Sequence, residues 1–152
     1  MASGIVFESE FVFSDGGRCR YVGKGKPFKS YQADDCVTRA VCNATGMDYK
    51  EAHDALFAIT RKHGYSPNQG VTKADLRKFI EKILGWEWHP LMGIGTGCQV
   101  HLCKSELPPG VAIISCSGHL TCSKDGVIYD TYDCSRNGHR CVYGYWSAPK
   151  KK

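Results

Sequence analysis

Cys36 is the residue of this chain best placed to act as a nucleophile. Apolar residues recur at helical spacing just after it and Gly46 is a natural stop, so the sequence predicts a helix that begins near Cys36. Free N–H groups and the helix dipole favour a thiolate in the first turn, although the expected N-cap, Asp34 or Asp35, opposes it. The alternative interpretation of Cys36 is a small buried side chain, which is what we expect of Cys42 in mid-helix. The apolar stripe of this helix consists of Val37, Ala40, Val41 and Ala44.

A histidine and an aspartate come together in a predicted hairpin in the second half of the chain. Asp125-Gly126 between two apolar strands is typical of a two-residue turn, and Lys124 then pairs with Val127. His119 and Asp130 lie diagonally on one face of that hairpin. A three-residue loop with a bulge would instead move Asp130 to the other face. That other face, the expected core side, carries Leu120, Cys122, Val127 and Tyr129.

Cys36, His119 and Asp130 are the residue types of a cysteine-dependent catalytic triad. In such a triad the cysteine attacks a carbonyl carbon, the histidine takes or holds the thiol proton, and the aspartate orients the ring. The alternatives are Asp133 for the third member and, for the base, His101 and His139, which have no comparable carboxylate partner in the sequence pattern.

Two more helices and a β-rich half must position these residues. Asp48 followed by Glu51 is a capping-box pattern, and Thr72 begins another amphipathic stretch. Short apolar runs from Trp86 onward predict strands. We therefore expect one α+β domain over residues 1–149, with a helical half at about 30–85, a β half at about 86–147 and a basic tail at 150–152. Residues 3–13 and 18–33 are expected to be extended on either side of a turn. The apolar side of the last helix consists of Leu76, Phe79, Ile80, Ile83 and Leu84.

The cysteine content indicates free thiols. The chain has nine cysteines, an odd number, and its first residues do not form a secretory signal, so we expect a reducing compartment and no disulfide framework. The spacings lack the Cys-x2-Cys knuckle that structural zinc sites favour. We expect no metal and no cofactor, with a zinc-stabilised nucleic-acid module as the minor alternative.

Composition places the chain among ordinary globular proteins. Hydrophobic residues make up 42% and charged residues 23% of the 152 residues, and no apolar run reaches the length of a membrane span. The net charge of +5 supports weak attraction to polyanions at most. We expect a cytoplasmic protein without a membrane or nucleic-acid partner.

Three blocks of the sequence resemble the papain-like cysteine peptidases in their small microbial forms. They are Asp35-Cys36-Val-Thr-Arg-Ala, Ser117-Gly118-His119-Leu and Asp125-Gly-Val-Ile-Tyr-Asp130-Thr. With the closing Val142 to Trp146, they are also similar to blocks in proteins of bacteriophages and bacteria. The resemblance covers about residues 30–146 and implies a papain-like fold, in which a helical lobe carrying the cysteine packs on an antiparallel sheet. It also implies an oxyanion hole made by Gln32 and the backbone N–H of Cys36.

The hypothesis that follows is a cysteine-dependent hydrolase that cleaves a peptide, isopeptide or related amide bond in a protein or peptide substrate. The alternative is a papain-like binding protein with a relaxed triad. If phage-encoded, such a protein would inhibit a host factor in the host cytoplasm.

Overall fold

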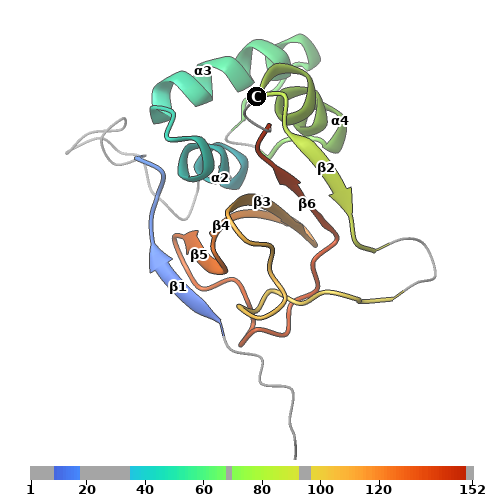
Figure 1. Ribbon diagram of the computed structural model, residues 1–152. Coiled ribbons are helices and arrows are strands. Elements are labelled where there is room, and N and C mark those ends of the chain that lie inside the picture. The colour runs from blue at the N-terminus through green and yellow to red at the C-terminus, as the bar shows by residue number, and fades with distance from the viewer. Residues whose placement is uncertain (1–8, 18–34, 68–69, 93–96, 150–152) are drawn as a thin grey trace, which may run out of the picture.

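The computed structural model describes residues 9–17, 35–67, 70–92 and 97–149. It is an α+β fold in which three α-helices lie over a six-stranded mixed sheet (Figure 1). The α+β prediction is confirmed. The elements in chain order are β1 (Glu10–Phe13), α2 (Cys36–Thr45), α3 (Tyr49–Thr60), η2 (Arg61–His63), α4 (Lys73–Arg77), η3 (Lys78–Ile83), β2 (Glu87–Pro90), β3 (Val111–Cys116), β4 (His119–Lys124), β5 (Val127–Asp130) and β6 (Gly144–Ser147).

Helix α2 begins at Cys36, as the apolar spacing predicts. It ends at Gly46, whose φ of 78° is left-handed and whose N–H donates to the carbonyl of Cys42. Asp35 occupies the N-cap position, but its side chain makes no capping hydrogen bond. The expected N-cap at Asp35 is confirmed in position but not in its hydrogen bond, because Asp35 bonds to other side chains described below. The alternative cap, Asp34, lies outside the described residues.

The next two helices begin at the predicted caps. The Asp48 side chain accepts from the N–H of Lys50, and the Thr72 hydroxyl accepts from the N–H of Asp75. After α4 the helix continues as the π-helical turn η3, which carries more residues per turn than an α-helix and so changes which side chains face inward. Ile80 is buried whereas Ile83 is 54% exposed. The expectation that both share one apolar side is wrong for this reason.

The sheet has the strand order β1-β5-β4-β3-β6-β2. Every neighbouring pair is antiparallel except β1 and β5, which run parallel along the left edge in Figure 1. The sheet is therefore mixed, and the antiparallel sheet that the resemblance implies is corrected at this edge. The expected extended segment over residues 18–33 and the basic tail lie outside the described residues.

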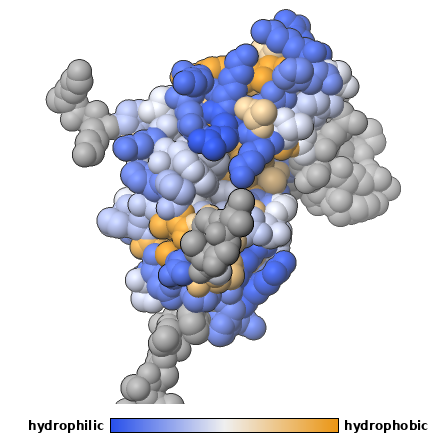
Figure 2. All heavy atoms as spheres, turned by 90° about the vertical axis from the view of Figure 1, so that its right-hand side faces the viewer, coloured by the Kyte–Doolittle hydropathy of each residue, from blue (hydrophilic) through white to orange (hydrophobic). Residues whose placement is uncertain are grey.

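The central strands are buried on both faces. Leu120, Ile113 and Trp146 belong to the core beneath the helices, whereas Ile114 and Ile128 belong to a second core shared with loops of the β half. The hairpin face that carries His119 is thus as well covered as the face expected to be the core side. Around these cores, the outer face that includes α4 and β2 is mostly hydrophilic with scattered apolar patches (Figure 2). The loop contribution to the second core consists of Leu102, Leu107, Cys134 and Val142.

One cysteine pair is bonded. Cys98 and Cys141 form a disulfide across 43 positions, where an isolated bridge between His101 and Cys141 brings the two loops together. The expectation of free thiols throughout is wrong for this pair. It is confirmed for the free cysteines of the described chain, which are Cys36, Cys42, Cys103, Cys116, Cys122 and Cys134.

Gly144 makes a close contact that predicts the effect of its substitution. A Cβ at this position of β6 would lie 2.3 Å from the Trp88 ring. We expect Gly144→Ala to lower the free energy of unfolding by about 1–3 kcal/mol, the usual cost of overpacking. In denaturant unfolding, Trp88→Leu should cost less in the Gly144→Ala background than in the wild type. Strictly additive effects would show that the indole is not what the new methyl group meets.

Candidate active site

The β4–β5 hairpin has the register that the sequence predicts. Lys124 pairs with Val127 and Cys122 with Tyr129, so the loop consists of two residues. Asp125 and Gly126 have φ values of 51° and 82°, as a type I′ turn requires. This register places His119 and Asp130 on the same face, and the alternative with a bulged three-residue loop does not occur.

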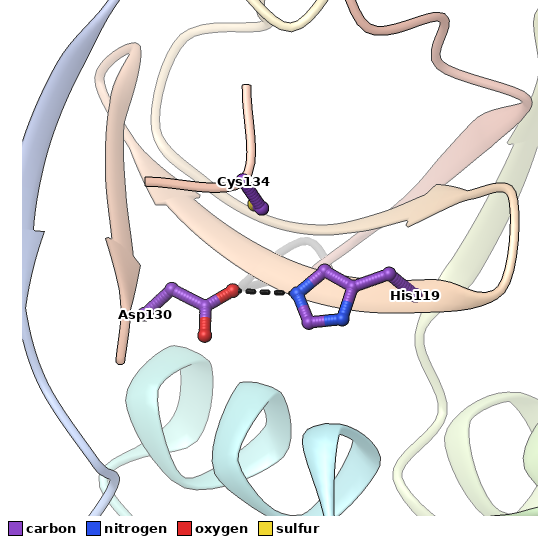
Figure 3. Close-up of side chains that lie close together, drawn as sticks. All are labelled: His119, Asp130 and Cys134. Carbon is purple, nitrogen blue, oxygen red and sulfur yellow. Dashed lines mark hydrogen bonds and ion pairs between the residues drawn. The ribbon is translucent and has the colours of Figure 1, made fainter. Parts of the chain in front are cut away.

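His119 and Asp130 form a buried ion pair. The ring Nε2 lies 2.7 Å from Oδ2 of Asp130, and the two side chains are 7% and 3% exposed (Figure 3). Burial lowers the pKa of His119, but hydrogen bonds with Asp130, Cys134 and Cys36 outweigh it and raise this pKa to about 12. Burial raises the pKa of Asp130, but hydrogen bonds from His119 and Thr121 outweigh it and lower this pKa to about 2. Both partners are therefore charged at neutral pH.

Cys36 lies at the other side of the ring. It is the first residue of α2, is half-buried, and lines a cavity of about 330 Å³ together with His119. Figure 3 shows one ring nitrogen directed at Asp130 and the other directed toward the ribbon of α2. The Cys36 thiol is one of the groups that raise the pKa of His119. Thus the three residues predicted as a triad lie together.

Arg39 is a member of this cluster that the sequence analysis missed. It lies one turn after Cys36 on α2, and its Nη1 donates to Oδ1 of Asp130 at 2.7 Å and to the Thr131 hydroxyl at 2.7 Å. Its Nε donates to Asp35 at 2.9 Å. Since Asp35 precedes Arg39 by four residues, an i, i+4 ion pair on the helix was the available signal.

A hydroxyl group extends the network. The Tyr49 hydroxyl donates to Oδ2 of Asp35 at 2.6 Å, so that carboxylate is held by α2 and α3 together. Both Asp35 and Tyr49 are buried. The chain of contacts runs from Tyr49 through Asp35, Arg39 and Asp130 to His119, and it ties the helix of the nucleophile to the hairpin of the base.

The cavity is lined mainly by apolar side chains with a basic rim. Trp88 is only partly buried and forms part of the wall. Lys73 and Arg77 of α4 line it as well, and the Arg77 guanidinium lies 5.6 Å from the Trp88 ring centroid while it pairs with Glu81. The apolar lining consists of Val37, Val71, Leu76, Trp88, Leu120, Tyr143 and Trp146.

The alternative site residues lie elsewhere. Asp133 is exposed and accepts from the N–H of Ser135, so the position predicted for a reserve third member is not used. His101 has a carboxylate partner after all, since its Nδ1 lies 3.1 Å from Glu106. His139 is exposed. Gln32, expected in the oxyanion hole, lies outside the described residues.

Cys134 is a second residue that the sequence analysis missed. It is 2% exposed, follows β5 in a loop, and places its side chain near His119 and Asp130 on the side away from α2 (Figure 3). Its thiol also raises the pKa of His119. No local pattern in the sequence distinguishes it from the packing cysteines.

The Arg39 network predicts a large loss of stability. Arg39→Met removes the guanidinium that pairs with the buried carboxylates of Asp35 and Asp130, and we expect the free energy of unfolding to fall by about 3–5 kcal/mol. The control is Lys50→Met, which removes an exposed i, i+4 partner of Asp54 on α3 and should have little effect. Urea unfolding of both variants gives the comparison. Equal effects would show that burial does not make the Arg39 pairs costly to break.

Comparisons of the chain with protein-family models, with curated proteins and with solved structures found no match. Among the residues that the structure describes, no helix has the length and apolar character needed to span a bilayer.

Proposed function

We propose that this protein is a cysteine-dependent hydrolase of papain-like type that cleaves a peptide, isopeptide or related amide bond. The observation that carries the proposal is a histidine held by a buried carboxylate at one nitrogen, with a half-buried thiol on the cavity side of the ring. That thiol is on the first residue of helix α2, so the backbone N–H groups of the first helical turn lie next to it.

In the proposed reaction His119 holds the proton of Cys36 as an imidazolium. The thiolate attacks the carbonyl carbon of the substrate, and the imidazolium then gives its proton to the leaving amine as the C–N bond breaks. Water, deprotonated by the now neutral ring, then attacks the thioester carbonyl. The C–S bond breaks, the carboxylic acid leaves, and the Cys36 thiolate and His119 imidazolium are restored. Asp130 orients the ring and balances its charge, and the backbone N–H of Cys36 is a donor for the oxyanion.

The lining of the cavity bears on the kind of substrate. Its apolar walls lie beside Cys36 and His119, and Lys73 and Arg77 stand at α4 on its rim. An apolar side chain near the scissile bond would bury its surface against Trp88 and Leu120, with a favourable contribution of about 1.5–3 kcal/mol for a large aliphatic or aromatic group. A library of peptide amides that varies this position is therefore the screen of choice.

Thiol labelling tests the proposal without a known substrate. We expect iodoacetamide at pH 6 to alkylate Cys36 faster than the five buried free cysteines of the described residues, because a thiolate paired with an imidazolium reacts where a thiol does not. His119→Ala should slow this labelling about tenfold or more, since the thiolate loses its counter-ion. Peptide-resolved mass spectrometry measures the rate at each cysteine. Uniformly slow labelling of all thiols would favour the binding protein instead.

Two cysteine substitutions separate catalysis from packing. We expect Cys36→Ala to abolish hydrolysis of any cleaved library peptide and to change the melting temperature little. Cys42 is 5% exposed within the helical core, so Cys42→Ala should lower the melting temperature by opening a small void. The reverse result, with a silent Cys42→Ala and a melted Cys36→Ala, would mean that the two roles are exchanged.

The pH dependence of turnover tests the role of Asp130. A raised pKa of His119 favours the protonated ring, so the alkaline fall in activity should lie well above pH 6.5 in the wild type. Asp130→Asn removes the hydrogen-bonded charge that raises this pKa, and the alkaline limb should move to lower pH. Turnover should fall more than substrate binding weakens, because the ring also loses its orientation. An alkaline limb that does not move would argue against Asp130 as the partner of the catalytic ring.

A further inference from the structure

Cys134 is a buried thiol that the proposed reaction does not use. It lies in the core on the loop side of the sheet, at 2% exposure, and so it cannot meet a substrate in the cavity. Its Sγ nevertheless lies within 4.8 Å of a ring nitrogen of His119. A thiol, an imidazole and a carboxylate that lie this close together are also the side chains that bind metal ions.

We propose that His119, Asp130 and Cys134 form a binding site for a thiophilic divalent cation such as Zn²⁺. One donor atom from each residue lies within 4.8 Å of the other two. Zn²⁺ binds nitrogen, oxygen and sulfur ligands at about 2.0–2.3 Å in tetrahedral geometry, which places neighbouring donors about 3.3–3.7 Å apart. The contact between Nε2 and Oδ2, now 2.7 Å, would have to open by about 0.6 Å.

The charges and hydrogen bonds around the three residues suit a dication. Arg39 donates a hydrogen bond to Oδ1 of Asp130, which fixes the orientation of the carboxylate. The other oxygen, Oδ2, then faces His119 and is available to the metal. Binding displaces one proton from the Cys134 thiol and one from Nε2 of the His119 imidazolium. The resulting thiolate, carboxylate and neutral imidazole balance the charge of Zn²⁺, and the fourth position is left for water.

A metal bound at this site would inhibit Cys36 through His119, on the side of the ring away from the cavity. This consequence rests on the proposed hydrolase function. With the metal on Nε2, the neutral ring carries its remaining proton on Nδ1, the nitrogen that points toward α2 (Figure 3). The ring can then neither accept the proton of Cys36 nor stabilise its thiolate as an imidazolium. The metal therefore inhibits without touching Cys36.

Metal titration of the full chain tests the site without turnover. Chelator-treated protein is titrated with Co²⁺, whose thiolate charge-transfer and tetrahedral bands report a sulfur ligand, and with Zn²⁺ in equilibrium dialysis. We expect one equivalent bound by the wild type and by Cys36→Ala. Cys134→Ala and Cys134→Ser should bind at least about a hundredfold more weakly, since even outer partners of metal sites contribute 10–100-fold. Cys122→Ala is the control, because Cys122 is an equally buried free thiol that is not one of the three ligands.

The outcomes of the titration and of the alkylation assay test the metal site and its effect on Cys36. Absence of a thiolate–Co²⁺ band in the wild type overturns it. Binding lost in Cys36→Ala and kept in folded Cys134→Ala or Cys134→Ser also overturns it, since the metal would then sit on the nucleophile. For the regulatory consequence, the ratio of Cys36 alkylation rates with and without Zn²⁺ should fall about tenfold in the wild type and stay near one in the Cys134 variants. Slow Cys36 alkylation in the metal-free wild type would count against the hydrolase and leave the binding result intact.

Discussion

The buried carboxylate of Asp130 is the charge on which the candidate site depends. Removing an ion from water costs several kcal/mol even after the protein relaxes, so a carboxylate at 3% exposure requires partners. Arg39 supplies one from the helical layer and His119 supplies one from the adjacent strand. Any shift of α2 along the sheet would break the first contact. The position of Cys36, one turn away on the same helix, is therefore fixed by the requirement to neutralise a residue of the sheet.

Two thiols interact with one imidazole, and their surroundings give them different chemistry. Cys36 stands at a helix N-terminus and borders the cavity, so a reacting carbonyl can reach it. Cys134 stands in a packed core, at 2% exposure, on the loop side of the sheet. Accessibility to the cavity therefore distinguishes the proposed nucleophile, Cys36, from the proposed metal ligand, Cys134.

The parts of the fold that follow from short-range rules were predictable. The start of α2, the caps at Asp48 and Thr72, and the register of the β4–β5 hairpin depend on residues within a few positions of one another. That is why the pairing of His119 with Asp130 could be derived before the structure. The coarse α+β architecture followed from the order of these elements.

The remainder depends on contacts between distant segments. The parallel pairing of β1 with β5 and the disulfide between Cys98 and Cys141 have no local signature. The π-helical turn η3 changes the buried side of a helix without any proline or glycine inside it. Arg39 occupies a helix position that composition alone would place at the surface, and its guanidinium is buried against Asp130 at the end of β5.

The parallel pairing of β1 with β5 also governs when the site can form during synthesis. Glu10 pairs with Val127, 117 residues later (127 minus 10), and the carbonyl of Asp130 accepts from the N–H of Ser14. Contacts of such sequence separation form late, because a long loop must close before they contribute any stability. While the ribosome is still making the helices, α2 emerges without the contact of Arg39 with Asp130 and without His119 near Cys36. Only after β5 has been translated can the first strand dock, so a nascent chain that stops before β5 would carry Cys36 without the His119–Asp130 pair beside it.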